Sequence, residues 1–193
     1  SRLMRIPSLI LTSTFLGENM KTDYEFLKTD IDGHILTVTI NRPERMNALH
    51  PPAHAEFDEV WNEFDKDENL WVGIVTGEGD RAFSAGNDLK FQAEAGGKMD
   101  INMASSGFAG LTSRFNLTKP LIAAVNGVSM GGGFEIALAC DLIVASTNAK
   151  FALPEPKVGL AALAGGMQRL PRQIGMKNAC LLYTSPSPRD LVI

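Results

Sequence analysis

Three consecutive glycines, Gly131 to Gly133, stand just before Glu135 in the stretch SMGGGFEIALACD. The apolar residues that follow predict a helix ending near Asp141, although glycine within a helix is about 1 kcal/mol less favourable than alanine. The glycines must therefore serve something other than helix stability. Because the first N–H groups of a helix have no partner within it, glycines there let a ligand atom approach those groups closely. The pattern predicts either an oxyanion-binding site or a tightly packed turn with Glu135 in solvent.

The spacing of these glycines argues against the two common phosphate-binding loops. A dinucleotide-binding loop needs a third glycine where this chain has Ile136, and an acidic ribose ligand about 20 residues further on. A Walker A loop needs lysine and a hydroxyl residue where Phe134 and Glu135 stand. A developing oxyanion is the ligand that a strand, a turn and an uncovered helix start can hold.

The composition predicts one globular domain and excludes several classes of partner. The chain has 193 residues, of which 45% are hydrophobic and 21% charged, and its net charge of -4 offers no basic field for nucleic acid. No apolar run approaches the roughly 20 residues of a membrane span. Cys140, Cys180 and the three histidines form no disulfide framework or metal-ligand pattern. We therefore expect no nucleic-acid, membrane or metal partner, and a cytoplasmic location.

The order of predicted elements is that of an α/β chain. Alternating apolar residues on either side of Asp32-Gly33 predict a β-hairpin. Apolar positions at i, i+3, i+4 and i+7 predict an amphipathic helix opened by Pro51-Pro52; they are Phe57, Val60, Trp61 and Phe64. Further strands are expected over 71–76, 121–125 and 142–146, and the 151–171 segment is expected to begin extended and to become helical after Gly165-Gly166. Another helix is expected over about 105–117, a loop over 82–89, and a polar, mobile stretch over 92–103.

Both ends are expected to lie outside the core. Residues 1–19 are weakly patterned and predict upstream translated sequence before a start at Met20, with a mitochondrial presequence as the alternative. The segment CLLYTSPSPRD, from Cys180, resembles the in-frame translation of a sequencing adapter, with a proline-rich tail as the alternative. The expected boundaries are an extension over 1–19, a core over 20–179 and a non-native tail over 180–193.

Two further segments have small or stiff backbone beside polar groups. The stretch RAFSAGNDLK, residues 81–90, places Ser84, Ala85 and Gly86 just after a strand. The stretch FALPEPKVGL puts Glu155 between two prolines, which restrict the backbone and supply no N–H groups. Glu155 is therefore expected on a stiff, non-helical segment, either directed into a site or as an ordinary surface acid.

Taken in order, four segments resemble the crotonase superfamily, specifically enoyl-CoA hydratase-like proteins: INRPERMNALHPP, AFSAGNDL, KPLIAAVNGVSMGGGFEIALACDLIVAS and FALPEPKVGLAALAGGMQRLPRQIG. The resemblance runs from about Asp23 to Ala179. It implies a spiral of ββα units that binds an acyl-CoA thioester, with coenzyme A as part of the substrate and no separate cofactor. It also implies C-terminal helices, expected to be missing here, that complete the acyl pocket and a homotrimer or dimer of trimers.

The resemblance also implies the site. The oxyanion hole of the family is matched by the backbone N–H groups of Asn87 and Gly132. The two glutamates that bind one water are matched by Glu135, expected as the base on water, and Glu155, expected as the acid at the α-carbon. Backbone contacts to CoA are expected at Met46, Ala48, Leu49, Ala85, Asn87, Asp88, Leu89, Gly131 and Gly132.

Two retained glutamates favour reversible hydration of a 2-enoyl-CoA. Carboxylates that share one site repel each other, which raises a pKa and makes proton transfer accessible near neutral pH. The alternatives are another crotonase-type reaction, such as isomerisation or hydrolysis, and a non-catalytic CoA-ester-binding protein. Asp88 is alternatively a cap of the following helix, and Arg45 or Lys90 either meet phosphate or lie in solvent.

Overall fold

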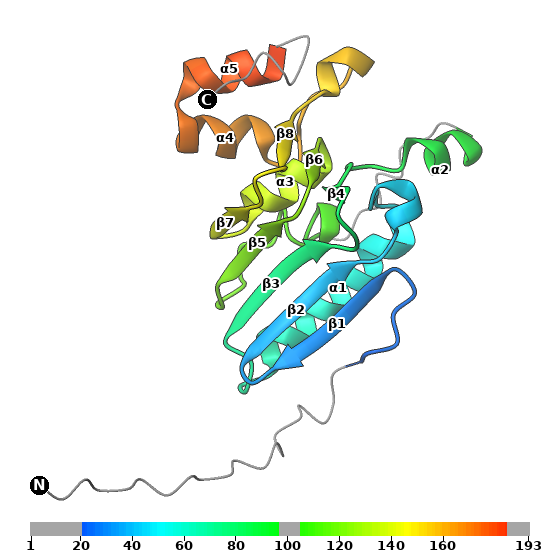
Figure 1. Ribbon diagram of the computed structural model, residues 1–193, viewed down its shortest axis with the longest axis vertical. Helices are drawn as coiled ribbons and strands as arrows, with labels where there is room; N and C mark the ends of the chain where they lie inside the picture. Colours follow the sequence, from blue (N-terminus) through cyan, green and yellow to red (C-terminus); the bar gives the residue numbers. More distant parts are fainter. Residues whose placement is uncertain (1–20, 97–104, 185–193) are drawn as a thin grey trace, which may run out of the picture.

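The computed structural model describes residues 21–96 and 105–184, which form two sheets with helices packed around them (Figure 1). The larger sheet has the strand order β1-β2-β3-β5-β7. The expected hairpin consists of β1 (Leu27–Asp32) and β2 (Ile35–Ile40), which pair antiparallel, and Gly33 in its turn has φ +58°. The other strands run parallel to β2; they are β3 (Val72–Gly77), β5 (Leu121–Val125) and β7 (Leu142–Ala145).

The helix α1 (Pro51–Lys66) covers one face of this sheet (Figure 1). The apolar stripe expected from its periodicity is fully buried and comprises Phe57, Val60, Trp61 and Phe64. Pro51 and Pro52 open the helix, where a missing N–H costs no intrahelical hydrogen bond. The structure confirms both the hairpin and this helix.

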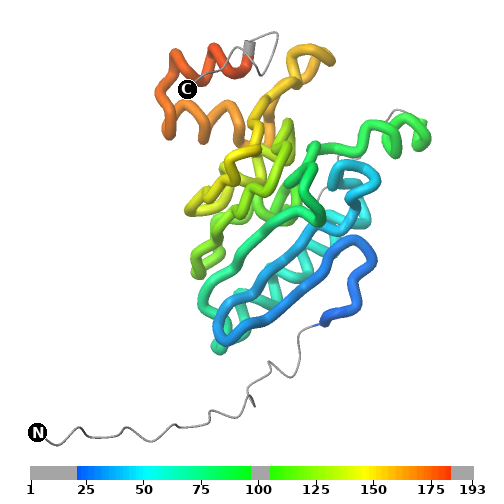
Figure 2. The backbone as a smooth tube through the Cα atoms, viewed as in Figure 1, coloured from blue at the N-terminus to red at the C-terminus, as the bar shows by residue number. Residues whose placement is uncertain are grey.

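A second, smaller sheet is present where the sequence predicted a loop and extended chain. Its strands are parallel in the order β4-β6-β8 and span β4 (Ala82–Ser84), β6 (Val128–Met130) and β8 (Lys150–Ala152). Strands of three residues are too short to show a two-residue period, so the loop expected over 82–89 is wrong for its first three residues. From β3 onward the chain gives one strand to each sheet in turn, which produces the expected spiral (Figure 2).

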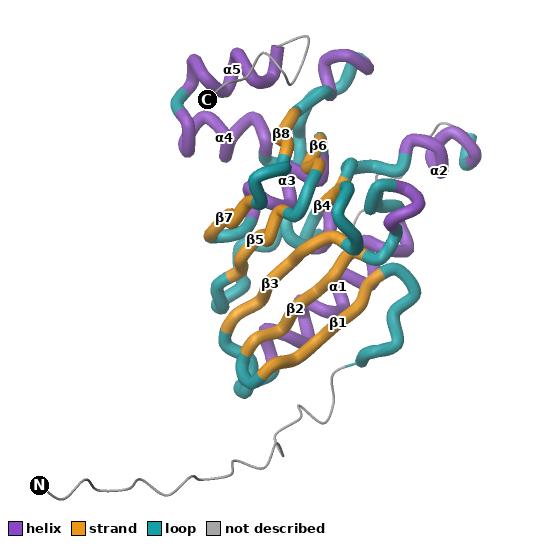
Figure 3. Tube along the Cα trace, in the orientation of Figure 1, coloured by secondary structure: helices purple, strands orange, loops and turns teal. Residues whose placement is uncertain are grey.

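The remaining helices are drawn in purple in Figure 3, and two of them begin at glycine-rich segments. The helix α3 (Gly132–Ala139) begins within the glycine triplet, α4 (Gly166–Ile174) follows Gly165, and α5 (Met176–Thr184) comes next. The helix α2 (Leu89–Glu94) extends into the first residues of the stretch expected to be polar and mobile over 92–103. The rest of that stretch from residue 97, the 1–19 extension and residues 185–193 of the expected tail lie outside the described residues.

The helix expected over 105–117 is wrong. The only helical turn in this part of the described chain is a 3-10 turn, η2 (Phe108–Gly110). A left-handed backbone, which interrupts an α-helix, occurs at Gly107, Ala109 and Gly110, with φ of +79°, +54° and +62°. The indole N–H of Trp61 also donates to the Ala109 carbonyl at 3.2 Å, so contacts with α1 replace the helical hydrogen bonds.

The helices of the described ranges, 21–96 and 105–184, are too short or too polar for any of them to cross a membrane. The longest of them, α1, has 16 residues and one polar face. That face bears the charged residues that the amphipathic pattern predicts.

Candidate active site

The glycine triplet combines close packing with an open helix start. A Cβ added at Gly133 would lie 2.1 Å from the carbonyl oxygen of Ser84, so glycine is what allows α3 to approach β4. A Cβ added at Gly132 would lie 2.7 Å from the ring of Phe108. Gly131 has φ +53°. Packing is therefore a sufficient reason for Gly133, and the ring of Phe108 also leaves no room for a side chain at Gly132, the first residue of α3.

The two N–H groups expected to form an oxyanion hole belong to adjoining stretches of backbone. Gly86 precedes Asn87 and has φ +89°. A Cβ added at Gly86 would lie 2.8 Å from the carbonyl oxygen of Met130 and 2.9 Å from the nitrogen of Gly132. The turn that carries Asn87 is therefore in direct contact with the start of α3.

The pairing of Leu49 with Asn87 sets the direction of the Asn87 N–H group. Leu49 donates to the carbonyl of Gly86 at 2.7 Å, and its own carbonyl accepts from Asp88 at 2.8 Å. In a parallel bridge of this kind the central residue turns its N–H away from its partner. Within the described chain, neither Asn87 nor Gly132 is seen to donate its N–H to a protein acceptor. Both groups are thus free to bind a ligand.

Glu135, on the first turn of α3, is buried and only 4% exposed. Its Oε1 accepts a hydrogen bond of 2.9 Å from the N–H of Gly166, the first residue of α4. Burial has the largest effect and, with the charge of Glu155, raises the pKa of Glu135 to about 7, against the opposing effects of the Gly166 and Ala164 amides and of Arg169. A carboxyl group that is half ionised near neutral pH is suited to exchanging protons.

Glu155 begins the single 3-10 turn η3 (Glu155–Val158), so the stiff segment has one helical turn where none was expected. A Cβ added at Gly131 would lie 3.2 Å from its Oε1, which places the carboxyl group beside the glycine triplet. Its Oε2 is buried and has no hydrogen-bond partner in the described part of the chain. Burial also raises the pKa of Glu155. A buried oxygen without a protein partner needs a water or ligand atom as its hydrogen-bond donor. An ordinary surface acid would be solvated and would have no such need.

The segments expected to contact CoA lie side by side. Ala85 donates its N–H to the carbonyl of Met46 at 2.9 Å, and the Leu49–Asn87 bridge continues the pairing. The side chains of Ala48 and Leu49 are buried, so those residues offer only backbone to a ligand. Leu89 is exposed at the start of α2. Arg45 and Lys90 are exposed as well.

Asp88 is engaged within the protein. One carboxylate oxygen accepts from the N–H of Phe91 at 3.0 Å, and the other forms an ion pair of 2.9 Å with Arg42. Burial alone would raise the pKa of Asp88, but the Phe91 N–H and the Arg42 guanidinium outweigh it and hold this pKa below its ordinary value. The helix-cap alternative is therefore confirmed, and the side chain of Asp88 is not free for a ligand.

Asn47 organises the same region and was not predicted from the sequence. It has φ +54°, and its side-chain oxygen accepts from the N–H of Arg42 at 3.0 Å, while its amide donates to Ala82 at 2.8 Å. The hydroxyl of Ser84 donates to the Asn47 carbonyl and accepts from the N–H of Gly86. Asparagine tolerates the left-handed backbone better than most residues, which is the one local signal that could have singled it out.

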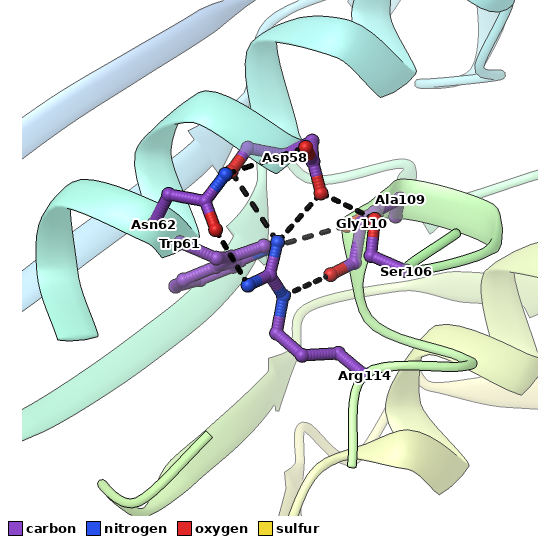
Figure 4. A network of polar contacts seen from close by, with 7 residues as sticks. All are labelled: Asp58, Trp61, Asn62, Ser106, Ala109, Gly110 and Arg114. Carbon is purple, nitrogen blue, oxygen red and sulfur yellow. Dashed lines mark hydrogen bonds and ion pairs between the residues drawn. The ribbon is translucent and has the colours of Figure 1, made fainter. Parts of the chain in front are cut away.

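A polar clamp fixes the turn that carries Phe108 (Figure 4). Arg114 forms an ion pair of 2.6 Å with Asp58 of α1 and donates to the Gly110 carbonyl at 2.7 Å. The hydroxyl of Ser106 donates to the same Asp58 carboxylate. This clamp, defined by Asp58, Ser106 and Arg114, holds the turn against α1.

Known proteins share both the sequence and the arrangement. The model of the enoyl-CoA hydratase/isomerase family matches residues 30–186. The chain belongs to this family. Among curated relatives, this hydratase/isomerase chain is 50% identical over 148 residues to the carnitinyl-CoA dehydratase of Escherichia coli K12, covering 77% of this chain and 56% of the relative. The carnitinyl-CoA dehydratase of Proteus mirabilis is 47% identical over 142 residues, covering 74% and 54%.

Solved structures of the hydratase/isomerase family have the same fold. An enoyl-CoA hydratase from Mycobacterium tuberculosis H37Rv superimposes with a TM-score of 0.76 at 38% identity, covering 84% of this chain and 62% of that one. A carnitinyl-CoA dehydratase from Mycobacterium avium 104 gives 0.77 at 39% identity, covering 84% and 63%. The expected crotonase-like α/β fold is confirmed. The chain spans between half and two thirds of the length of these relatives.

Proposed function

We propose that the protein catalyses the reversible addition of water to a 2-enoyl-CoA thioester. The observation that carries this proposal is that Glu135 and Glu155 meet at the start of α3, where the N–H groups of Asn87 and Gly132 are free. Membership of the hydratase/isomerase family supports an acyl-CoA as the substrate.

In the proposed reaction the thioester carbonyl accepts hydrogen bonds from Asn87 and Gly132. These bonds stabilise the negative charge that develops on the oxygen as water adds to the β-carbon, and such a donor is typically worth ~10²–10³ in rate. Ionised Glu135 takes a proton from the attacking water, and protonated Glu155 gives its proton to the α-carbon. One water has then been added across the double bond, and a proton must pass from Glu135 to Glu155, directly or through solvent, before the next turnover.

The electrostatics of the two carboxyl groups support this division of roles. Burial raises the pKa of both groups. Glu135 has N–H donors that stabilise its ionised form, so it is the better candidate for the base. The Oε2 of Glu155 has no hydrogen-bond partner among the described residues, so this oxygen is available to pass a proton to the substrate. The charge of ionised Glu155 raises the pKa of Glu135, so the two carboxyl groups share a proton near neutral pH.

A second candidate is the dehydration of carnitinyl-CoA, because the curated relatives that are about half identical to this chain carry that activity in their names. Loss of water from a 3-hydroxyacyl thioester is the reverse of the proposed hydration and needs the same two carboxyl groups. The distinguishing feature is the substrate, whose trimethylammonium group requires an apolar or aromatic surface.

The test is to mix the protein with crotonyl-CoA and, separately, with the enoyl thioester that carries a trimethylammonium group. We expect the ultraviolet absorbance of the conjugated thioester to fall as water adds. E135Q and E155Q should each lower kcat by at least about 100-fold and leave thioester binding, measured by calorimetry, within about threefold. E68Q, which removes an exposed glutamate on the loop after α1, is the matched control and should not change kcat.

Other outcomes would point elsewhere. Full activity of E155Q would contradict the assigned mechanism. Binding of both thioesters without turnover would favour a CoA-ester-binding protein. A double bond that moves without addition of water would favour an isomerase, and release of free CoA a hydrolase.

We further propose that the protein acts as a homotrimer or dimer of trimers in the cytoplasm. Support for self-association comes from large apolar side chains that are exposed on the described chain, among them Leu142 and Val144, each 61% exposed, and Leu163, 77% exposed. Contiguous exposed apolar surface commonly marks a protein interface. The buried thiol of Cys140 is free, which is compatible with a reducing compartment.

A further inference from the structure

The guanidinium of Arg169, on α4, joins two turns that are far apart in the sequence. One nitrogen donates to the carbonyl of Ala164 at 3.3 Å, and another donates to the carbonyl of Thr112 at 2.9 Å. The group lies on bare backbone, since a Cβ added at Gly165 would be 2.0 Å from Arg169 Nη1. Gly165 has φ +109°, a backbone conformation that favours glycine.

The first of these turns, residues 164–166, holds Glu135. The N–H of Gly166 donates to Glu135 Oε1 at 2.9 Å, and the Ala164 amide acts on the same carboxyl group. Arg169 therefore binds this turn through the Ala164 carbonyl, whereas Glu135 binds the N–H groups of the same turn. A shift of the turn away from Arg169 would move the donors that orient the carboxyl group.

The second turn, residues 108–112, covers Gly132. Thr112 closes it, because its hydroxyl accepts from the N–H of Phe108 at 2.8 Å and its own N–H donates to the Phe108 carbonyl at 3.2 Å. The Phe108 ring then lies 2.7 Å from the position of a Cβ added at Gly132. By holding the Thr112 carbonyl, Arg169 connects this turn to the one that holds Glu135.

Arg169 also contributes charge. Among the described residues, the charged side chains that act on Glu135 are Glu155, from the segment after β8, and Arg169, from α4. They act in opposite directions, since the Glu155 charge raises the pKa of Glu135 and the Arg169 charge lowers it. The guanidinium also lies over the exposed ring of Phe115, at 6.0 Å from the ring centroid.

We propose that Arg169 is a positioning residue of the active site, whose guanidinium sets the spacing between the turn that holds Glu135 and the turn that covers Gly132. This proposal rests on the proposed function for the roles of Glu135 and Gly132, whereas the link itself is a matter of geometry. Lysine would keep the positive charge but lacks the planar fork that reaches two carbonyls at once. Charge and bridging can therefore be separated experimentally.

The experiment compares R169M, R169K and the control R172M, which removes an exposed arginine from the same helix. The pKa of Glu135 is read by carbon NMR on protein labelled at the glutamate carboxyl carbons, with E135Q to assign the signal. We expect R169M to raise this pKa by about 0.5–1 unit and to move the acidic limb of kcat/KM equally. R169K should keep the pKa within about 0.3 unit of the parent value but lower kcat about tenfold, with KM within twofold. R172M should change neither quantity.

Two results would overturn the proposal. If R169M unfolds more easily while the Glu135 pKa and the pH profile stay in place, Arg169 is merely structural. If R169K retains full kcat, the bridge between the two turns does not matter for catalysis. If R169M does not fold, R169K alone still tests the proposal. The NMR titration needs no turnover, so a protein without hydratase activity would contradict the proposed function and still report on Arg169.

Discussion

At the scale of single residues, the burial of Glu135 that favours proton transfer also opposes folding. Its pKa is about 7 in the folded chain against an ordinary value of 4.5, so folding binds a proton between these pH values. Stability supplied by the protonated group is complete below about pH 4.5 and is lost as the pH rises through about 7. The ionised carboxyl therefore costs about 2–3 kcal/mol at pH 8.

We expect E135Q to be more stable than the parent at pH 8 by about 2–3 kcal/mol and nearly equal to it at pH 4.5. Glutamine keeps the oxygen that accepts from Gly166 and carries no charge. Urea unfolding at both pH values measures the difference, and E68Q controls for losing a negative charge at an exposed site. An E135Q variant that is less stable at pH 8 would show that the carboxyl group is better accommodated than its burial implies.

At the scale of elements, the clamp between α1 and the Phe108 turn joins parts that share no secondary structure. Arg114 is 6% exposed and Asp58 29% exposed, so their ion pair is shielded from water far more than an ordinary surface pair. Removing one partner leaves a charge and several donors unsatisfied.

We expect D58N to lower the free energy of unfolding by about 2–3 kcal/mol, and the double variant D58N/R114M to cost less than the sum of its single changes. The matched control is E59Q on the same helix, whose ion pair with Lys21 is nearly half exposed and should be worth less than about 1 kcal/mol. Urea denaturation at neutral pH gives all four values. Equal losses in D58N and E59Q would mean that the clamp is no stronger than a surface pair.

The elements also show what sequence can and cannot predict. The hairpin and α1 were predictable because each has a regular apolar period and local turn signals, such as Gly33 and the prolines at 51 and 52. The structure of the 105–117 segment was not predictable, because Ala109 adopts a left-handed backbone where it contacts α1, a partner distant in the sequence. The strands β4 and β6 were missed because three residues cannot show a period, whereas β8 falls where extended chain was expected.

The residues of the candidate site likewise fall into those that the sequence predicts and those that it does not. Asn87, Gly132, Glu135 and Glu155 could be named because a family motif carries each of them, and the structure brings them to one place. Asn47 and Arg169 also bind partners more than thirty residues away in the sequence, and the local sequence does not reveal those contacts.

At the scale of the whole molecule, the spiral explains how three distant segments reach one place. Each turn of the chain puts a strand in both sheets, and the segments that follow β4, β6 and β8 lead to Asn87, Gly132 and Glu155 respectively. Because these strands are parallel and adjacent, their carboxyl ends meet at one edge of the small sheet. The oxyanion donors and one of the two acids thus come from three successive turns, and α3 adds Glu135.

The same spiral leaves β7 at the edge of the five-stranded sheet within the described residues, with Leu142 and Val144 exposed. If second copies cover this face, V144K should shift the protein from a trimer or larger species toward the monomer, because a buried lysine without a partner costs several kcal/mol. Light scattering after size-exclusion chromatography measures the mass. W71S, which removes an apolar side chain of similar exposure beside β3, is the control and should leave the mass unchanged. A parent protein that is monomeric at micromolar concentration would refute self-association, and a V144K trimer would move the interface away from β7.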